Sequence, residues 1–505
     1  MTNNTETSLF EKFKETGKHG IIFGLGKTLT SAISFVLIPL YTTHLMTSSY
    51  GVLGLILVIG KILAAVFALG LCYGLLRSYY DYDDEQSRRE IISTTLVLIA
   101  ISCGVLFVCG ILFSGYLSIL LFGNNDYQIH LFITFIISIF TILNSIPFVV
   151  FRARKKSVQY AVLQIFFFIV GMSTIIYFVA IKNWGVFGVL LGYLITGIIF
   201  SFALYFCIRK EIVFKFSKLE ARKIIHYGAP LVPVGLAALI VHYIDRYMLS
   251  YYYPLSMVGL YHLGYQFGMG LTLIFVVPLR LIWGPMFLSV KKHRNAKDFY
   301  SKALTYTVFV GAFLFLLSAL LSKEVIQIFT NKEYWAAYTV VPLIALAYSS
   351  LSVETILNVG VTLRRKTKIM ALYSLIGAMT NVILNFVLIP KYGVIGAAYA
   401  TLISFIVMIV IVYFYNQRLM KIKYEWNRIL KISLVTALIF AVGYRVVIND
   451  VYGSVAFKVG NILLGPLILH LLRFYSKEEI QRMKQIFEFV LVKLKIKESA
   501  NGLIP

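Results

Sequence analysis

The most regular feature of this chain is a series of long apolar stretches separated by short polar segments. Each stretch holds about 20 residues, the length that a helix needs to cross a hydrocarbon core ~30 Å thick. We therefore predict fourteen membrane-spanning helices, at residues 20–44, 52–76, 91–113, 128–150, 158–181, 185–207, 228–250, 256–280, 299–321, 337–361, 369–389, 393–415, 429–447 and 454–472. Because no connection is long enough for a soluble domain, the pattern predicts an all-α integral membrane protein.

The apolar stretches form two sets that resemble each other in sequence. Six of the eleven amino acids in residues 178–188 recur at an offset of 208 positions. The same offset pairs Gly51 with Gly259, and an offset of 207 relates residues 121–127 to residues 328–334. Three matches in the same order indicate a duplicated unit of about 208 residues.

Each repeat contains six predicted spans, and this even number brings both repeats into the membrane from the same side. The repeats are therefore predicted to be parallel and related by a pseudo-two-fold axis along the membrane normal. Transporters built in this way bind substrate between two lobes and alternate access by rocking. The predicted divisions are a first six-helix lobe, a second six-helix lobe, a helix pair and an amphipathic cytoplasmic tail, at residues 1–210, 211–418, 419–475 and 476–505.

Composition and charge agree with this class. Hydrophobic residues make up 59% of the chain and charged residues 14%, with a mean hydropathy of +0.83. The net charge of +25 comes from Lys and Arg in alternate connections, which the positive-inside rule places in the cytoplasm together with both termini. The basic connections predict contact with anionic lipid of the inner leaflet. Nucleic-acid binding is not expected, because the basic residues do not share one soluble face.

Two lysines lie inside predicted spans rather than at their ends. Lys27 is about a third of the way along the first span, and Lys61 is roughly midway along the second. Ionisable residues at such depth are costly and mark candidate functional sites. Because a tight turn joins these spans, both lysines are predicted to face one water-filled cavity, where an anionic substrate would relieve their repulsion. The alternative is that each lysine reaches the interface or backbone carbonyls.

The second repeat carries different charges. Asp245 and Arg246 are neighbours in span 228–250, and adjacent helical residues point about 100° apart, so each is expected to find a partner elsewhere. They would form a charge cluster at an outer gate or on the cavity wall; alternatively, Arg246 extends to the interface and Asp245 caps a neighbour. Glu354 is predicted to couple a proton or cation, or to balance a basic residue. None of these charges recurs at the 208-residue offset. The positions where the two repeats differ in charge are therefore the candidates for interaction with the substrate.

Other polar residues in the spans are interpreted as structural. Arg280 is expected to extend to the inner interface, and Asn381 and Asn385, one turn apart, are expected to join helices. The four cysteines lack metal-ligand spacing, so no metal site is predicted.

The chain offers no catalytic motif. The Gly-Lys-Thr triplet at residues 26–28 lacks the glycine that a phosphate-binding loop needs five residues before Gly26, where Ile21 stands. No hydrolase or zinc-protease motif is present in the sequence. We therefore predict a protein that is not an enzyme, uses no cofactor and does not consume ATP directly.

Several short strings resemble a known family. They are residues 38–42 and 50–53, residues 244–247 continuing to 258–261, and residues 392–396. Together with the layout of six, six and two spans, they resemble the polysaccharide flippase branch of the superfamily that joins multidrug exporters, oligosaccharide-lipid flippases and polysaccharide exporters. The resemblance covers nearly the whole chain. It implies a flippase that moves an undecaprenyl-pyrophosphate-linked oligosaccharide from the inner to the outer leaflet through a cationic cavity.

On this resemblance, the candidates to contact pyrophosphate or acidic sugars are Lys27, Lys61 and Arg246, and the candidates for coupling or charge balance are Asp245 and Glu354. Only Asp245 and Arg246 lie within a matching string, whereas the lysines are inferred from physical reasoning. An ion gradient is the expected source of energy. The resemblance also implies a monomer in the cytoplasmic membrane of a bacterium or archaeon, with a polymerase as a candidate partner.

Two other functions remain open within the same fold. A lipid II flippase of peptidoglycan synthesis would also need cationic residues in its cavity. A cation-coupled multidrug exporter would need a buried carboxylate in the first or seventh span, where this chain has Lys27 and the Asp245–Arg246 pair. A membrane scaffold, by contrast, would not explain charges kept at midplane depth.

Overall fold

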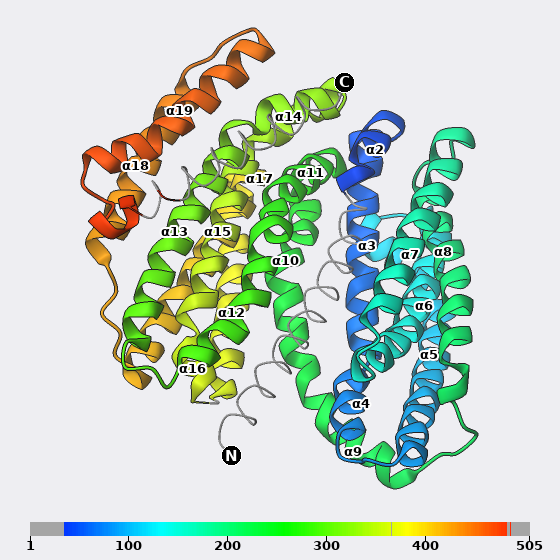
Figure 1. Ribbon diagram of the computed structural model, residues 1–505. Helices are drawn as coiled ribbons and strands as arrows, with labels where there is room; N and C mark the ends of the chain where they lie inside the picture. The colour runs from blue at the N-terminus through cyan, green and yellow to red at the C-terminus, as the bar shows by residue number, and fades with distance from the viewer. Residues whose placement is uncertain (1–34, 365, 482–484, 486–505) are drawn as a thin grey trace, which may run out of the picture.

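The computed structural model describes residues 35–364, 366–481 and 485, and every regular element within them is a helix (Figure 1). The first half contains α2 (Ile38–His44), α3 (Thr47–Phe67), α4 (Leu71–Tyr79), α5 (Glu85–Phe122), α6 (Gln128–Ala153), α7 (Ser157–Ile176) and α8 (Gly185–Ile208). The second half contains α9 (Lys218–Gly228), α10 (Val232–Tyr252), α11 (Leu255–Leu271), α12 (Val277–Val290), α13 (Ala296–Leu320), α14 (Ser322–Phe329), α15 (Val341–Leu357), α16 (Val359–Leu363) and α17 (Thr367–Leu419). The chain then forms α18 (Trp426–Arg445) and α19 (Val451–Leu471). The predicted all-helical membrane fold is confirmed.

Local sequence sets the bounds of these helices. The 38-residue α5, for example, begins after Asp84, whose side chain accepts a hydrogen bond of 2.7 Å from the backbone N–H of Ser87. It ends at Gly123, which has a left-handed φ of 76°. A carboxylate at the N-cap satisfies a free N–H of the first turn, and glycine adopts the left-handed conformation without steric cost.

Twelve helical segments of the described residues are long and apolar enough to cross a membrane. The predicted spans 369–389 and 393–415 fall within one of them, α17, but the chain reverses inside it at Gly393, whose φ is 55°. Gly396 consequently packs against the backbone carbonyl of Leu388. Gly185, 208 positions before Gly393, has a φ of 54° at the start of α8, so the duplication extends to backbone conformation. The predicted span 20–44 lies mostly outside the described residues, and the count of fourteen therefore stays a prediction.

The two halves meet where α3 and α11 begin. These helices start at Thr47 and Leu255, which are 208 residues apart, so they occupy equivalent places in the two repeats. Gly51 packs against the carbonyl group of Leu255, and Gly259 packs against that of Thr47. Such a reciprocal contact is the arrangement that a two-fold axis produces.

Further contacts join the halves near the same end. The hydroxyl of Tyr334 donates to the carbonyl of Leu45 at 2.9 Å, and the hydroxyl of Tyr247 donates to that of Leu55 at 2.8 Å. In Figure 1 the helices of the two halves approach each other at the top, near α2, α3 and α11; at the bottom, α9 packs against α4 of the first half, whereas α16 lies away from that half. The predicted divisions at residues 210, 418 and 475 stay predictions.

The last two helices, α18 and α19, pack beside α13. A buried ion pair of 2.5 Å between Lys458 and Glu324 connects α19 to α14, and the hydroxyl of Ser454 donates to the same carboxylate at 2.6 Å. Of the predicted amphipathic tail, residues 482–484 and 486–505 lie outside the described residues.

Candidate functional site

Lys61 of α3 lies at the contact between the two halves. Its side chain is exposed, and its Nζ donates to the hydroxyl of Tyr243 of α10 at 2.8 Å. The same ammonium lies 4.4 Å from the centre of the Tyr243 ring. Lys61 thus reaches from the first half to an aromatic side chain of the second. Lys27 is outside the described residues, so the predicted common cavity of the two lysines stays a prediction.

Asp245 and Arg246 are deeply buried in α10, with exposed fractions of 0% and 1%. Contrary to our expectation, they pair with each other, because Nη1 of Arg246 lies 3.0 Å from Oδ1 of Asp245. The same Nη1 donates to the carbonyl of His242, four residues earlier, at 2.8 Å. The arginine therefore folds back along its own helix and reaches the neighbouring carboxylate, which the angle between adjacent residues did not predict.

Aromatic and imidazole groups complete the environment of this ion pair. Tyr261 donates its hydroxyl hydrogen to Oδ2 of Asp245 at 2.5 Å, and Nε of Arg246 donates to Nδ1 of His262 at 3.2 Å. The guanidinium carbon lies 4.2 Å from the ring centre of Tyr265. Both charges are therefore hydrogen-bonded away from water, as buried charges must be. In this conformation Arg246 has almost no surface through which it can touch a ligand.

Arg280 is a further cation with a partly exposed side chain. Arg280 belongs to α12 and its side chain is 49% exposed. We expected Arg280 to extend toward the interface, but its Nε donates to the hydroxyl of Thr355 at 3.1 Å. Sequence analysis therefore missed Arg280 as a candidate; a charge two residues after Pro278 inside an apolar span was the available signal.

Glu354 of α15 lies opposite Arg280. Its Oε2 is 3.5 Å from Nη2 of Arg280, and its Oε1 accepts hydrogen bonds from the hydroxyl of Tyr373 at 2.6 Å and from Nδ2 of Asn358 at 3.2 Å. At 7% exposure, this carboxylate is nearly buried. The arrangement is compatible with charge balance, while the predicted coupling role stays a prediction.

Asn381 and Asn385 in the first part of α17 are both fully buried and bond to each other at 3.0 Å. Oδ1 of Asn385 and Nδ2 of Asn381 have no protein partner, nor does the hydroxyl of Thr401 in the second part of α17, which is also fully buried. Unpaired buried polar atoms carry a free-energy cost, so a structural or functional reason is required for them.

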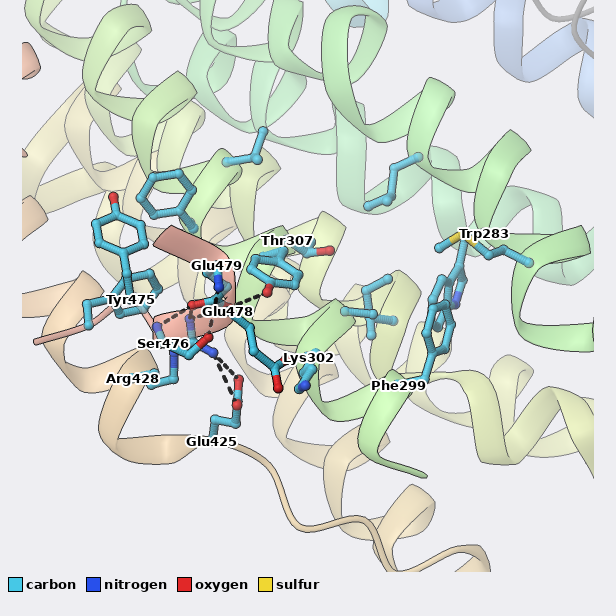
Figure 2. Close-up of a pocket in the computed structure, with 18 of the residues that line it drawn as sticks. Trp283, Phe299, Lys302, Thr307, Glu425, Arg428, Tyr475, Ser476, Glu478 and Glu479 are labelled. Atoms are coloured by element: carbon cyan, nitrogen blue, oxygen red, sulfur yellow. Dashed lines mark hydrogen bonds and ion pairs between the residues drawn. The ribbon is translucent and has the colours of Figure 1, made fainter. Parts of the chain in front are cut away.

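Figure 2 shows a large cavity, with a volume of about 1030 Å³. Its walls are mainly apolar and come from α12, α13 and the segment that follows α19. Arg428 of α18 forms an ion pair of 2.9 Å with Glu479 at the rim, and Lys302 and Lys477 also line the cavity. This combination of apolar wall and charged rim suits an amphiphile.

Comparisons with known proteins agree with this architecture. The lipid II flippase MurJ in its inward closed conformation is similar over 90% of this chain and 100% of that structure, with a TM-score of 0.74 and 18% identity. An inward-facing multidrug transporter of the MATE family is similar over 80% of this chain and 95% of that structure, with a TM-score of 0.64 and 12% identity. At these identities the likeness concerns the fold alone.

Sequence relatives narrow the class. An uncharacterised membrane protein of Methanocaldococcus jannaschii is 22% identical, over 93% of this chain and 98% of its own length. A probable low-salt glycan biosynthesis flippase of Haloferax volcanii is 23% identical, over 42% of this chain and 45% of its own length.

The chain is a multi-pass helical membrane protein whose fold is shared by a lipid flippase and a multidrug transporter. The profile of the family described as polysaccharide biosynthesis protein matches residues 16–291. The chain belongs to this polysaccharide biosynthesis protein family, within the polysaccharide and lipid flippase branch of the superfamily.

Proposed function

We propose that this flippase moves a lipid-pyrophosphate-linked oligosaccharide from the cytoplasmic to the outer leaflet by alternating access between its two lobes. In this proposal the lobes are residues 1–210 and 211–418, and the basic connections face the cytoplasm. The end closed by Gly51 and Gly259 then faces outward. The conformation described here would therefore receive substrate from the inner leaflet.

The observation that carries the proposal is an exposed cation on each lobe. Lys61 of the first lobe donates to Tyr243 at the contact between the lobes, and Arg280 of the second lobe is half exposed. A diphosphate bound by both cations would form charge-assisted hydrogen bonds to both lobes at once. Its affinity would therefore depend on how the lobes are arranged, which a rocking transporter needs. Arg246, which is buried, would contact substrate only after the lobes move.

The cavity of Figure 2 supports a lipid-linked rather than a water-soluble substrate. Apolar side chains such as Phe275, Leu279 and Val310 line much of its wall. Burying an apolar chain against them would contribute about 25 cal/mol for each Å² removed from water. In a membrane this gain is smaller, because the chain leaves lipid rather than water, so the cavity would position the lipid more than hold it tightly.

Two alternatives differ in the head group. A lipid II flippase would use the same cations and the same apolar cavity, and is distinguished only by the substrate it accepts. A cation-coupled drug exporter needs an available carboxylate, whereas Asp245 is already paired with Arg246 and bonded to Tyr261. The polar interface between the lobes therefore favours an anionic over a cationic substrate.

For the energy source, we propose an ion gradient. Oδ1 of Asn385 and the hydroxyl of Thr401 are buried oxygen atoms without protein partners, and both belong to α17. Oxygen atoms of this kind are ligands for hard cations. A cation bound between the two parts of α17 could couple its own gradient to the movement of the second lobe.

Reconstitution in ATP-free liposomes would test both parts of the proposal. The substrate would be a fluorescent prenyl-pyrophosphate-linked oligosaccharide, and flipping would be measured by quenching from outside. Because hydrogen bonds to charged groups contribute about 1.5–3 kcal/mol, Lys61→Met and Arg280→Met should each slow flipping about ten- to hundredfold. Lys292→Met, an exposed charge in a basic connection, is the control and should flip normally.

Wild-type rates in both variants would refute the role of the cations. Flipping that ignores pH, Na⁺ and membrane potential would refute the ion coupling alone. Preference for a fluorescent lipid II over the prenyl-linked oligosaccharide would favour the peptidoglycan alternative.

A further inference from the structure

A second, smaller pocket of about 340 Å³ lies in the second lobe beside Arg280. It is formed by the later part of α12, the end of α15, α16 and the beginning of α17. Its polar lining consists of Arg280, Glu354, Thr355, Asn358, Thr362 and Tyr373, and its apolar lining includes Trp283.

The polar groups of this pocket combine donors and acceptors. Glu354 presents carboxylate oxygens, Tyr373 and Asn358 bond to it at 2.6 Å and 3.2 Å, and Oδ1 of Asn358 has no protein partner. Arg280 is held only by Thr355 and by a contact of 3.5 Å to Glu354, and it is half exposed. The amide, carboxylate and guanidinium groups are planar and can each engage two adjacent ligand atoms.

The charge of the lining restricts the class of ligand. A metal cation in this pocket would be repelled by Arg280, which lies beside the pocket's one carboxylate. An anion would be repelled by that carboxylate, Glu354, and by the unpaired oxygen of Asn358. A neutral ligand with several hydroxyl groups can donate to Glu354 and Asn358 while it accepts from Arg280. Sugar rings have this chemistry, with donors and acceptors on adjacent carbons.

Trp283 connects this pocket to the large cavity. It lines both spaces, and it stacks on Phe299 with an interplanar angle of 11° (Figure 2). With 3% of its surface exposed, Trp283 is a fixed wall between an apolar cavity and a polar pocket. The two spaces thus match the two parts of an amphiphile, with Arg280 at the polar side of the boundary.

We propose that the pocket formed by Arg280, Glu354, Asn358 and Tyr373 binds a sugar ring of the substrate's head group and so contributes to glycan selection. This inference rests on the proposed function. The lipid chain occupies the large cavity, Arg280 contacts the diphosphate, and the sugar nearest to the diphosphate enters the smaller pocket. Asn358 is then a specificity-determining residue, because its buried and unpaired Oδ1 accepts a hydrogen bond from an O–H or N–H of the sugar, which farnesyl diphosphate lacks.

Two soluble probes distinguish the contribution of the sugar to binding from that of the lipid chain and the diphosphate. Farnesyl diphosphate carries the chain and the charge, and the same diphosphate linked to one N-acetylhexosamine adds a ring. Binding to the purified full-length protein in detergent is measured calorimetrically. We expect the sugar-bearing probe to bind about tenfold more tightly, since one or two additional hydrogen bonds contribute about that factor.

The variant Asn358→Leu keeps the volume of the side chain and removes its polar atoms. It should abolish the tenfold advantage of the sugar-bearing probe, measured as the ratio of the two affinities within the same variant. Tyr373→Phe, which removes one hydroxyl, should reduce the advantage and provides a second variant if Asn358→Leu misfolds. Ser350→Ala is the control, because Ser350 is half-buried in α15, outside the lining of the pocket, and its hydroxyl donates to the carbonyl of Leu346.

Equal binding of both probes to the wild type would overturn the sugar pocket while leaving the proposed function intact. A sugar advantage that persists in both variants would also overturn it. Failure of the wild type to bind either probe would instead refute the proposed function on which the inference rests.

Discussion

The reciprocal contact of Gly51 and Gly259 makes a sharp prediction about conformation. A Cβ atom added to Gly51 would lie 3.0 Å from the backbone nitrogen of Gly259, and one added to Gly259 would lie 3.1 Å from that of Gly51. Each would also overlap a helical carbonyl oxygen, of Leu255 or Thr47. Because backbone atoms cannot rotate away as side chains do, the helices α3 and α11 would have to separate.

Overpacking of this kind costs about 1–3 kcal/mol. The closed arrangement is the one that loses this free energy, since the clash disappears when the lobes part at this end. At 1.4 kcal/mol for each factor of ten, Gly51→Ala should shift the equilibrium from closed to open at this end by roughly 5- to 150-fold. The double variant Gly51→Ala/Gly259→Ala should cost less than the sum of the single changes, because one separation relieves both clashes.

Spin labels on the exposed residues Thr43 and Ala336, in a background without the four native cysteines, would report the distance between the lobes at this end. The expected result is a new population at longer distance in Gly51→Ala. Gly460→Ala is the matched control, because a Cβ there meets nothing within 4 Å. An unchanged distance distribution in Gly51→Ala, or the same shift in Gly460→Ala, would refute the reasoning.

The ion pairs Asp245–Arg246 and Arg428–Glu479 lead to further predictions. Asp245→Asn leaves the buried Arg246 without its counter-ion and should lower the free energy of unfolding by about 3–5 kcal/mol, measured as a lower midpoint of thermal unfolding. Tyr261→Phe removes a single hydrogen bond to the carboxylate and should cost less, about 1.5–3 kcal/mol, so equal losses would contradict a buried ion pair. Arg428→Gln should release the segment after α19, seen as faster proteolysis near Glu479. Burial raises the pKa of Glu479, but its hydrogen bonds more than offset this and hold it below 4.5. The attachment should therefore be complete above pH 4.5 and weaken as the pH falls through that lowered pKa, and a rate of proteolysis independent of pH would argue against the pair.

Residue patterns were most informative where they depended on the length and spacing of apolar runs. A stretch of about 20 apolar residues can satisfy its backbone in a membrane only as a helix, so the spans could be placed from the sequence. The duplication predicted equivalent helices, and α3 and α11 begin 208 residues apart. Even the reversal inside α17 could be read from the repeat, because Gly393 corresponds to Gly185.

Patterns were least informative about charged side chains. The helical angle between neighbours suggested that Asp245 and Arg246 stay apart, but a long side chain can bend back along its helix. Similarly, position in the span led us to treat Arg280 as structural. Its orientation depends on Thr355 and Glu354, 75 and 74 residues away in the chain.

The sequence by itself determined that the chain is a duplicated helical membrane protein with unduplicated charges, because hydropathy and repetition are properties of the chain alone. Only the tertiary structure decided which charges are buried in pairs, such as Asp245 and Arg246, and which remain exposed between the halves, such as Lys61. The reason is physical: the partner and the exposure of a side chain depend on how helices rotate and pack against one another. In this protein those contacts join residues separated by as many as 289 positions, as between Tyr334 and Leu45.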